Sequence, residues 1–240
     1  MRVVTFNICH ATRGRGTAVD HLALVAACVA LDADVLALQE VDRGTRRSDG
    51  VDQLALVAEA CHMTHAFVPV LSVGGGWSGN ALLVRGRIHE VETVRLRGRA
   101  RWPRPDRRGA LVARVAVGDV AATVAVAHLS LAVLDNVAQE RAVLARLTSR
   151  PGPHVLLGDL NRRLPWVRWQ VERAGLELVS QGGPTAPADA PRFRIDHIAV
   201  GGFTVTAVEV VDTGTSDHLA VSAELVPTPP ANDASGDGHH

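Results

Sequence analysis

The chain of 240 residues contains no lysine and no tyrosine, and it has only three cysteines. Because lysine is absent, every permanent side-chain cation is an arginine, whose planar guanidinium can hold a phosphate through two hydrogen bonds. Cys9, Cys28 and Cys61 are odd in number and far apart, which argues against a disulfide framework and against a paired-cysteine zinc site. Cys28 and Cys61 fall in helical patterns and are predicted to be buried thiols.

The sequence also has no apolar run of membrane-spanning length, and its first predicted strand begins at Arg2. We therefore expect a cytoplasmic protein without a transmembrane segment. The formal net charge is zero, whereas proteins that wrap nucleic acid through their overall field are usually basic. This balance argues against indiscriminate DNA binding and leaves a local basic groove open.

Apolar residues make up 47% of the chain, and its length suits one large domain with an extensive core. We expect residues 1–226 to form this domain, as a monomer. Residues 227–240 consist largely of Pro, Ala, Asp, Gly and His, and are predicted to form a disordered tail.

Short apolar segments alternate with amphipathic ones. The patterns predict strands over residues 2–8, 34–39, 66–70, 79–84, 88–95, 110–117, 120–127, 154–158, 195–200, 203–211 and 218–225. Helices are predicted over residues 18–31, 51–62, 136–148 and 166–174. The predicted fold class is therefore α/β (α+β), with two mixed sheets packed face to face and helices on the outside.

Polar residues stand where the apolar strands end. They are Asn7 in "RVVTFN", Glu40 in "ADVLALQE", His128 in "AATVAVAH", Asp159 and Asn161 in "HVLLGDLN", Asp196 in "RIDHI", and Asp217 and His218 in "SDHLAV". If the strands deliver them to one rim, their carboxylates, carboxamides and imidazoles suit a hard divalent cation and a hydrolytic acid/base pair.

In this order, the segments "TFNI", "LQEVD", "GN", "AHLS", "GDLN", "RIDHI" and "SDHLAV" resemble the endonuclease/exonuclease/phosphatase superfamily, from residue 2 to residue 225. That superfamily includes DNase I-like nucleases, AP endonucleases, inositol-polyphosphate 5-phosphatases and neutral sphingomyelinases. The resemblance implies a DNase I-like fold, a four-layer α/β sandwich. It also implies divalent-metal-dependent hydrolysis of a phosphoester by in-line attack of an activated water.

The resemblance implies a metal site around Glu40. Glu40 would be the principal ligand of Mg²⁺, with Mn²⁺ as a substitute, and Asn7 and Asp217 would lie beside the ion. A solvated glutamate at a strand end and an asparagine that caps a turn are the simpler alternatives. Whether the site holds one ion or two stays open.

The catalytic assignments also follow from the resemblance. Asp159 would activate or orient the attacking water, and Asn161 would hold the phosphate or that aspartate. His218 would contact the scissile phosphate, as a base or as a charged donor, with Asp196 fixing its tautomer. His128 would stabilise the phosphate oxygen that gains charge in the transition state.

Substrate contacts are less specific in the sequence. Asn80 matches a family position beside the site, although a plain turn explains the Gly79–Asn80 pair too. Arg43, with Arg46 and Arg47 close behind, could grip a phosphate, or these residues could form a solvated loop. Residues 95–108 hold seven arginines and are predicted to be an exposed connector, with binding to nucleic acid or an anionic lipid headgroup as the alternative.

Two departures bear on the branch of the superfamily. AP endonucleases use a tyrosine near the phosphate and an aspartate two residues after the first-strand asparagine, and this chain has no tyrosine and has Cys9 at that position. Three functions are carried forward. They are a phosphoesterase acting on a small-molecule or lipid-headgroup phosphodiester or phosphomonoester, a DNA or RNA nuclease, and a non-catalytic binding scaffold.

Overall fold

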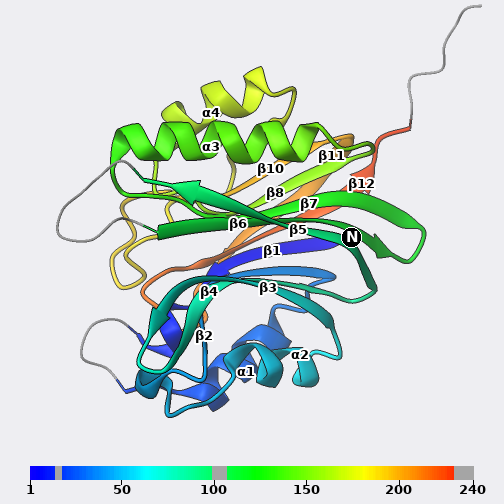
Figure 1. Ribbon diagram of the computed structural model, residues 1–240. Coiled ribbons are helices and arrows are strands. Elements are labelled where there is room, and N and C mark those ends of the chain that lie inside the picture. Colours follow the sequence, from blue (N-terminus) through cyan, green and yellow to red (C-terminus); the bar gives the residue numbers. More distant parts are fainter. Residues whose placement is uncertain (14–17, 99–106, 230–240) are drawn as a thin grey trace, which may run out of the picture.

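The computed structural model describes residues 1–13, 18–98 and 107–229. Two six-stranded β-sheets pack face to face, and helices cover the outer face of each (Figure 1). From bottom to top in Figure 1, the layers are the first two helices, one sheet, the other sheet and the last two helices. This arrangement confirms the predicted four-layer α/β sandwich.

The first sheet holds the beginning and the end of the described chain. Only one neighbouring pair, the first two strands of the sequence, is parallel. In spatial order its strands are β11 (Phe203–Val211), β12 (Ala220–Pro227), β1 (Arg2–Asn7), β2 (Val35–Arg43), β4 (Gly76–Val84) and β3 (Thr64–Val73).

The second sheet has the same plan, with a single parallel pair, β7 and β8. The predicted hairpin at Gly118–Asp119 joins two of its strands, because Val117 pairs with Val120 across that turn. In spatial order the strands are β5 (Arg87–Arg97), β6 (Arg107–Val117), β7 (Val120–His128), β8 (His154–Asp159), β10 (Asp196–Gly201) and β9 (Glu177–Val179).

Four α-helices and two short 3₁₀ turns complete the described fold. The helices are α1 (His21–Ala30), α2 (Gln53–Ala60), α3 (Val133–Thr148) and α4 (Leu164–Arg173), and the 3₁₀ turns are η1 (Cys9–Ala11) and η2 (Arg46–Ser48). Asp20 and Asp52 begin α1 and α2, because their carboxylates accept hydrogen bonds from the amides of Ala23 and Ala55. Within the described residues, no helix is both long and apolar enough to cross a membrane.

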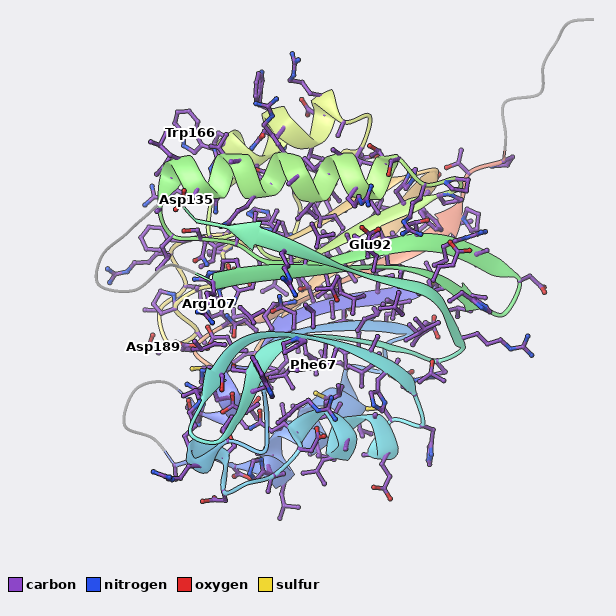
Figure 2. The ribbon with its side chains drawn as sticks, viewed as in Figure 1. Phe67, Glu92, Arg107, Asp135, Trp166 and Asp189 are labelled. Atoms are coloured by element: carbon purple, nitrogen blue, oxygen red, sulfur yellow. The ribbon has the colours of Figure 1, made fainter. Side chains whose placement is uncertain are left out.

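Three apolar cores hold the four layers together (Figure 2). Strand β1 shows how the sequence builds two of them. Val3 packs in the core between the sheets, whereas Val4 and Phe6 pack beneath α1 and α2. Successive side chains of a strand point to opposite faces, so an all-apolar strand fills two cores at once.

Element boundaries differ from the sequence prediction in a few places. Strand β3 is longer than the predicted 66–70, and helix α3 starts at Val133 rather than at residue 136. The three-residue strand β9 was not predicted. Strands β5 and β6 take up both ends of the Arg-rich segment, and residues 99–106 between them lie outside the described residues. Most of the predicted tail, residues 230–240, also lies outside the described residues.

A glycine is required where β8 reaches the rim. A Cβ atom on Gly158 would lie 2.0 Å from the carbonyl oxygen of Ala127 on β7, a distance that real Cβ atoms do not reach. Close pairing of these two parallel strands therefore needs glycine directly before Asp159. This contact gives the "GD" pair of the sequence a physical reason.

A buried carboxyl group on α3 gives the first prediction. Glu140 is 1% exposed, and its Oε2 accepts hydrogen bonds from Arg162 and Gln170. Its Oε1 has no hydrogen-bond partner among the described residues. Burial raises the pKa of Glu140 to about 7.

Because the folded-state pKa lies above the unfolded one, the protonated group stabilises the fold at low pH. This contribution is lost as the pH rises through about 7. Glu140→Gln keeps the side chain neutral at every pH. The difference between the unfolding free energy of this variant and that of the parent should therefore shift in favour of the variant by ~3 kcal/mol between pH 4.5 and 8. Urea unfolding at several pH values measures this difference. A gap that stays constant with pH would show that Glu140 is already ionised in the folded protein.

Candidate active site

The ends of three neighbouring strands in the second sheet bring polar residues side by side. In the parallel pair β7–β8, His128 is in register with Asp159, and in the antiparallel pair β8–β10, Asp159 is in register with Asp196. The side chains of His128, Asp159 and Asp196 therefore lie side by side on three neighbouring strands, at one edge of the sheet.

The first sheet delivers Asn7 and Glu40 to the same rim. Asn7 is the last residue of β1, and Glu40 lies at a bulge in β2, where the pairing with β4 shifts between Leu38 and Val41. Glu40 has a φ of 57°, a conformation that side-chain-bearing residues seldom adopt. The bulge thus turns Glu40 out of the strand alternation and toward the other sheet.

Asn7 connects the two sheets. Its Nδ2 lies 3.1 Å from Asp159 Oδ2 and 3.4 Å from Glu40 Oε1, and its Oδ1 accepts a hydrogen bond from the amide of Cys9. The amide group therefore presents its two N–H donors to two carboxylates from different sheets. In this arrangement Asn7 orients both carboxylates.

His218 is held by Asp196. Its Nδ1 lies 2.9 Å from Asp196 Oδ2, and the hydroxyl of Thr185 donates to the same oxygen at 2.6 Å. Burial alone would lower the pKa of His218, but the charge and hydrogen bond of Asp196 outweigh it and raise the pKa to about 10. Since Nδ1 is committed to Asp196, Nε2 faces the site, 4.0 Å from Asp159 Oδ2.

Asp159 and His128 meet at the centre of the site. His128 Nε2 lies 3.4 Å from Asp159 Oδ2, and His128 Nδ1 lies 4.0 Å from Glu40 Oε1. Burial, together with the neighbouring Asp196 carboxylate, raises the pKa of Asp159. Burial and the charge of Arg108 lower the pKa of His128 to about 3, so its imidazole is neutral and does not form true ion pairs.

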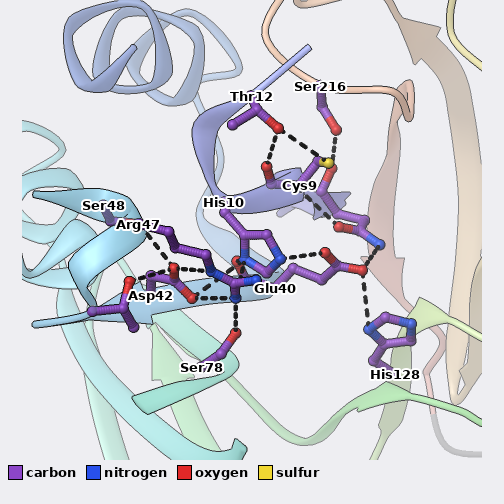
Figure 3. A network of polar contacts seen from close by, with 12 residues as sticks. Cys9, His10, Thr12, Glu40, Asp42, Arg47, Ser48, Ser78, His128 and Ser216 are labelled. Atoms are coloured by element: carbon purple, nitrogen blue, oxygen red, sulfur yellow. Dashed lines mark hydrogen bonds and ion pairs between the residues drawn. The ribbon is translucent and has the colours of Figure 1, made fainter. Parts of the chain in front are cut away.

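Glu40 has a second partner, His10, which the sequence analysis did not single out (Figure 3). His10 Nε2 lies 2.9 Å from Glu40 Oε2, and His10 Nδ1 lies 2.8 Å from the Glu40 carbonyl oxygen and 3.3 Å from Asp42 Oδ1. Burial opposes protonation of His10, but hydrogen bonds to Asp42 and Glu40 prevail and raise its pKa to about 9. Burial likewise opposes ionisation of Glu40, but the hydrogen bond from His10 helps to lower its pKa to about 2.

Of the remaining predicted residues, Asn161 and Asp217 adjoin this group. The Asn161 amide N–H donates to Asp159 Oδ1 at 2.9 Å, while its side chain donates to the Leu129 carbonyl. Asn161 therefore fixes Asp159 through its backbone. Asp217 lies beside the thiol of Cys9, whose pKa rises to about 11 through burial and the charges of Asp217 and Glu40, despite a hydrogen bond from Thr12 that lowers it.

Asn80 and Arg43 have other partners. The side chain of Asn80 lines the site but donates from Nδ2 to the Gly109 carbonyl at 2.8 Å. Arg43 pairs with Asp52 at 2.7 Å and lies over the ring of Phe67, outside the residues that line the cleft. The structure thus gathers eight of the predicted residues around one point, places Asn80 at its edge and directs Arg43 elsewhere.

A cleft of about 430 Å³ opens beside Glu40 and His128. It lies between the first sheet, with the β3–β4 hairpin, and the start of β6, where Arg107 lies at this end of the sandwich (Figure 2). The lining residues are His10, Glu40, Arg47, Val70, Leu71, Ser78, Gly79, Asn80, Arg107, Arg108 and His128.

Besides His10, sequence reasoning missed two hydroxyl groups of the site. Ser216 donates to the Asn7 carbonyl at 2.6 Å and accepts from the His218 amide, and Thr185 supports Asp196. Ser216 stands directly before Asp217 in the "SDH" segment, so its position offered a signal. Thr185 lies in a Gly/Pro-rich loop that carries no periodic pattern, so no signal pointed to it.

Comparison with known proteins identifies the family of this chain. The profile of the Endonuclease/Exonuclease/phosphatase family matches residues 4–218. The chain belongs to this family. A search of curated protein sequences gives no match.

Several solved structures have a similar fold. An endonuclease/exonuclease/phosphatase from Beutenbergia cavernae is 27% identical, with a TM-score of 0.78 over 95% of this chain and 71% of that one. The catalytic domain of human Nocturnin with bound sulfate is 18% identical, with a TM-score of 0.76 and coverages of 95% and 94%. A mannosyl-6-phosphatase from Bacteroides thetaiotaomicron is 17% identical, with a TM-score of 0.70 and coverages of 94% and 99%.

The loops that follow His128 and Asp159 are tied to each other and to α3. The buried Asn136 donates from Nδ2 to the carbonyls of Ser130 and Leu160, each at 2.7 Å, and so bridges the two loops. The Leu129 amide also donates to the Asp159 carbonyl at 3.0 Å. Helix α3, which does not itself reach the cleft, therefore holds these two loops together.

Asn136→Asp tests this bridge. The carboxylate would face two carbonyl oxygens, and each unpaired acceptor should cost about 1–3 kcal/mol of stability. The loops should separate, and turnover of a phosphoester should fall even below the unfolding temperature. Val143→Ala, in the same helix and buried without bonds to the loops, is the control: it should lose comparable stability and keep its activity. Equal activities in the two variants would contradict the bridging role.

Proposed function

We propose that the protein is a divalent-metal-dependent phosphoesterase that hydrolyses a phosphodiester or phosphomonoester. The observation that carries this proposal is the convergence of Glu40 and Asp159, from different sheets, on the single amide of Asn7. Two carboxylates brought this close repel each other unless a cation or donors lie between them. Membership of the family supports the same reaction class.

The donor chemistry of the site fits a hard cation such as Mg²⁺, with Mn²⁺ as a substitute. Glu40 would hold the ion through Oε1, because Oε2 is already engaged by His10. Asn7 and Asp217 would lie beside it. Asp159, Asp196 and His218 also bring ligand atoms within 4.8 Å of one another, but His218 and Asp196 bond each other, so we favour Glu40 as the anchor.

When bound, the cation would neutralise charge on the phosphate and assist the attacking water. The residues of the chain would do the rest. Asp159 would orient the water, held in place by Asn7 and by the Asn161 amide. His218, fixed through Nδ1 by Asp196, would present Nε2 to the scissile phosphate. His128 would lie next to the phosphate oxygen that becomes more negative, and such positioned groups supply much of the rate.

The cleft favours a small phosphoester over a long nucleic acid. Its volume of about 430 Å³ is in the range of small-molecule sites, and the net charge of the chain is zero. The presence of a mannosyl-6-phosphatase among the structural neighbours supports a phosphorylated small-molecule group as the substrate. A nuclease is the second candidate, because Arg107 and Arg108 lie at the cleft.

Removing a central group should abolish the reaction and spare the fold. Asp159→Asn and His218→Ala should each lower turnover by about two to three powers of ten, the usual cost of losing one positioned transition-state contact. Steady-state hydrolysis and thermal unfolding of the same samples provide the measurement. Hydrolysis at the parental rate by either purified variant would refute the catalytic assignment.

Metal removal and a substrate panel test the rest of the proposal. Dialysis against EDTA should abolish hydrolysis, and Mg²⁺ or Mn²⁺ should restore it. The panel comprises p-nitrophenyl phosphate, bis-p-nitrophenyl phosphate, inositol phosphates, sphingomyelin, an abasic oligonucleotide and a supercoiled plasmid. We expect the small esters to be turned over fastest. Activity confined to the plasmid or the oligonucleotide would favour the nuclease, and no metal-dependent activity on any substrate would favour a binding scaffold.

A further inference from the structure

A fully buried aspartate next to the cleft holds an arginine in place. The side chain of Asp42 is 0% exposed, and it accepts hydrogen bonds from the hydroxyls of Thr45 at 2.7 Å and Ser48 at 2.8 Å (Figure 3). Arg47 donates to both of its oxygens, from Nε at 2.6 Å and from Nη2 at 2.8 Å. With His10 Nδ1 3.3 Å from Oδ1, donors surround the buried carboxylate of Asp42.

The guanidinium of Arg47 is therefore fixed and still accessible. Its side chain is 39% exposed and lines the cleft, and its Nη2 also reaches the Ser78 hydroxyl at 3.2 Å. One imidazole, that of His10, separates Arg47 from the carboxylate of Glu40, since Nη2 lies 3.0 Å from His10 Nδ1. Both of these atoms are donors when His10 is protonated, so they are held together by Asp42 rather than by each other.

The charges of the cleft favour the binding of an anion at a position separate from Glu40. Among the described residues that line it, three are arginines and one, Glu40, is a carboxylate. Val70 and Leu71 also line the cleft and make part of its surface apolar. A guanidinium whose geometry is fixed in advance loses little entropy when it binds a phosphate.

Arg43 shows that the position of Arg47 is specific. Both arginines follow Glu40 closely, and both pair with an aspartate through Nε and Nη2. Arg43 does so on the outer surface, over Phe67, and does not line the cleft. The two residues therefore form a matched pair, one at the cleft and one away from it.

We propose that the substrate carries a second phosphate, and that Arg47 binds this group in the cleft while the scissile phosphate lies between His128 and His218. The inference rests on the proposed function, since it names the substrate class of the same site. Arg107 and Arg108 add positive charge along the opposite wall. The recognised chemistry is two phosphates on one small scaffold, either free in solution or as a lipid headgroup.

Competitive inhibition tests this assignment. The reporter reaction is hydrolysis of p-nitrophenyl phosphate or bis-p-nitrophenyl phosphate with Mg²⁺. The competitors are inositol 1-phosphate and inositol 1,4-bisphosphate, which differ by one phosphate. In the parent protein the bisphosphate should bind at least about tenfold more tightly, as expected for an added charge-assisted hydrogen bond.

Arg47→Met should remove this preference, so that the two inhibition constants come within about twofold of each other. Arg43→Met should leave both constants as in the parent. Because Arg47→Met leaves Asp42 buried without its cation, the double variant Asp42→Asn/Arg47→Met provides a second measurement, in which the charge and its partner are both removed. The preference should be lost in the double variant too.

Two further inhibitors test whether the ligand is a free bisphosphate, a lipid headgroup or a nucleic-acid strand. Phosphatidylcholine vesicles with phosphatidylinositol 4-phosphate would inhibit more strongly than the soluble bisphosphate if the headgroup belongs to a lipid. A single-stranded tetranucleotide that inhibits in an Arg47-dependent manner, where the bisphosphate does not, would overturn the proposal in favour of a nucleic-acid strand.

These experiments distinguish failure of the proposed function from failure of the second-phosphate inference. If no substrate of the panel is hydrolysed with Mg²⁺ or Mn²⁺, the proposed function itself fails. If a reporter is hydrolysed but the parent binds the two inositol phosphates equally, or Arg47→Met keeps the preference, the second-phosphate inference alone is wrong.

Discussion

The whole site depends on two carboxylates that approach each other across the sandwich. Glu40 comes from one sheet and Asp159 from the other, and the amide of Asn7 donates to both. Buried carboxylates need compensating donors or cations, and the surrounding residues supply them: His10 bonds Glu40, and the Asn161 amide bonds Asp159. The apolar core between the sheets keeps the two strand ends at this distance. The packing of the two sheets thus brings the two carboxylates close enough to repel each other, and the surrounding hydrogen-bond donors offset this repulsion.

Much of this could be read from the sequence. An apolar strand that ends on a carboxylate or an imidazole has no packing reason for that residue, so Asn7, His128 and Asp159 were visible as site candidates. The two-sheet fold was likewise predictable, because apolar strands outnumber the amphipathic helices, which cannot cover so many strands except as outer layers. The family resemblance ordered these segments and correctly implied the DNase I-like sandwich.

The residues around Glu40 were harder to predict, for a physical reason. The bulge in β2 shifts the alternation of side chains, so spacing from Glu40 does not tell which of Arg43 and Arg47 faces the cleft. His10 lies in a turn where Cys9, His10 and Ala11 all have positive φ, a conformation that no periodic pattern announces. The contact of His10 with Asp42 depends on how two segments far apart in sequence pack against each other, and no local sequence pattern predicts that packing.

The bulge has an evolutionary consequence. Glu40 holds a left-handed backbone conformation that favours glycine and disfavours most other residues. The backbone conformation that directs the Glu40 carboxylate toward the other sheet is therefore unfavourable for a residue with a side chain. Glycine at residue 40 would relax the backbone, but it would also leave His10 and Asn7 without the carboxylate that accepts their hydrogen bonds. A relative that had lost Glu40 would therefore be expected to differ at His10 and Asn7 as well, so that loss of this site would take several substitutions.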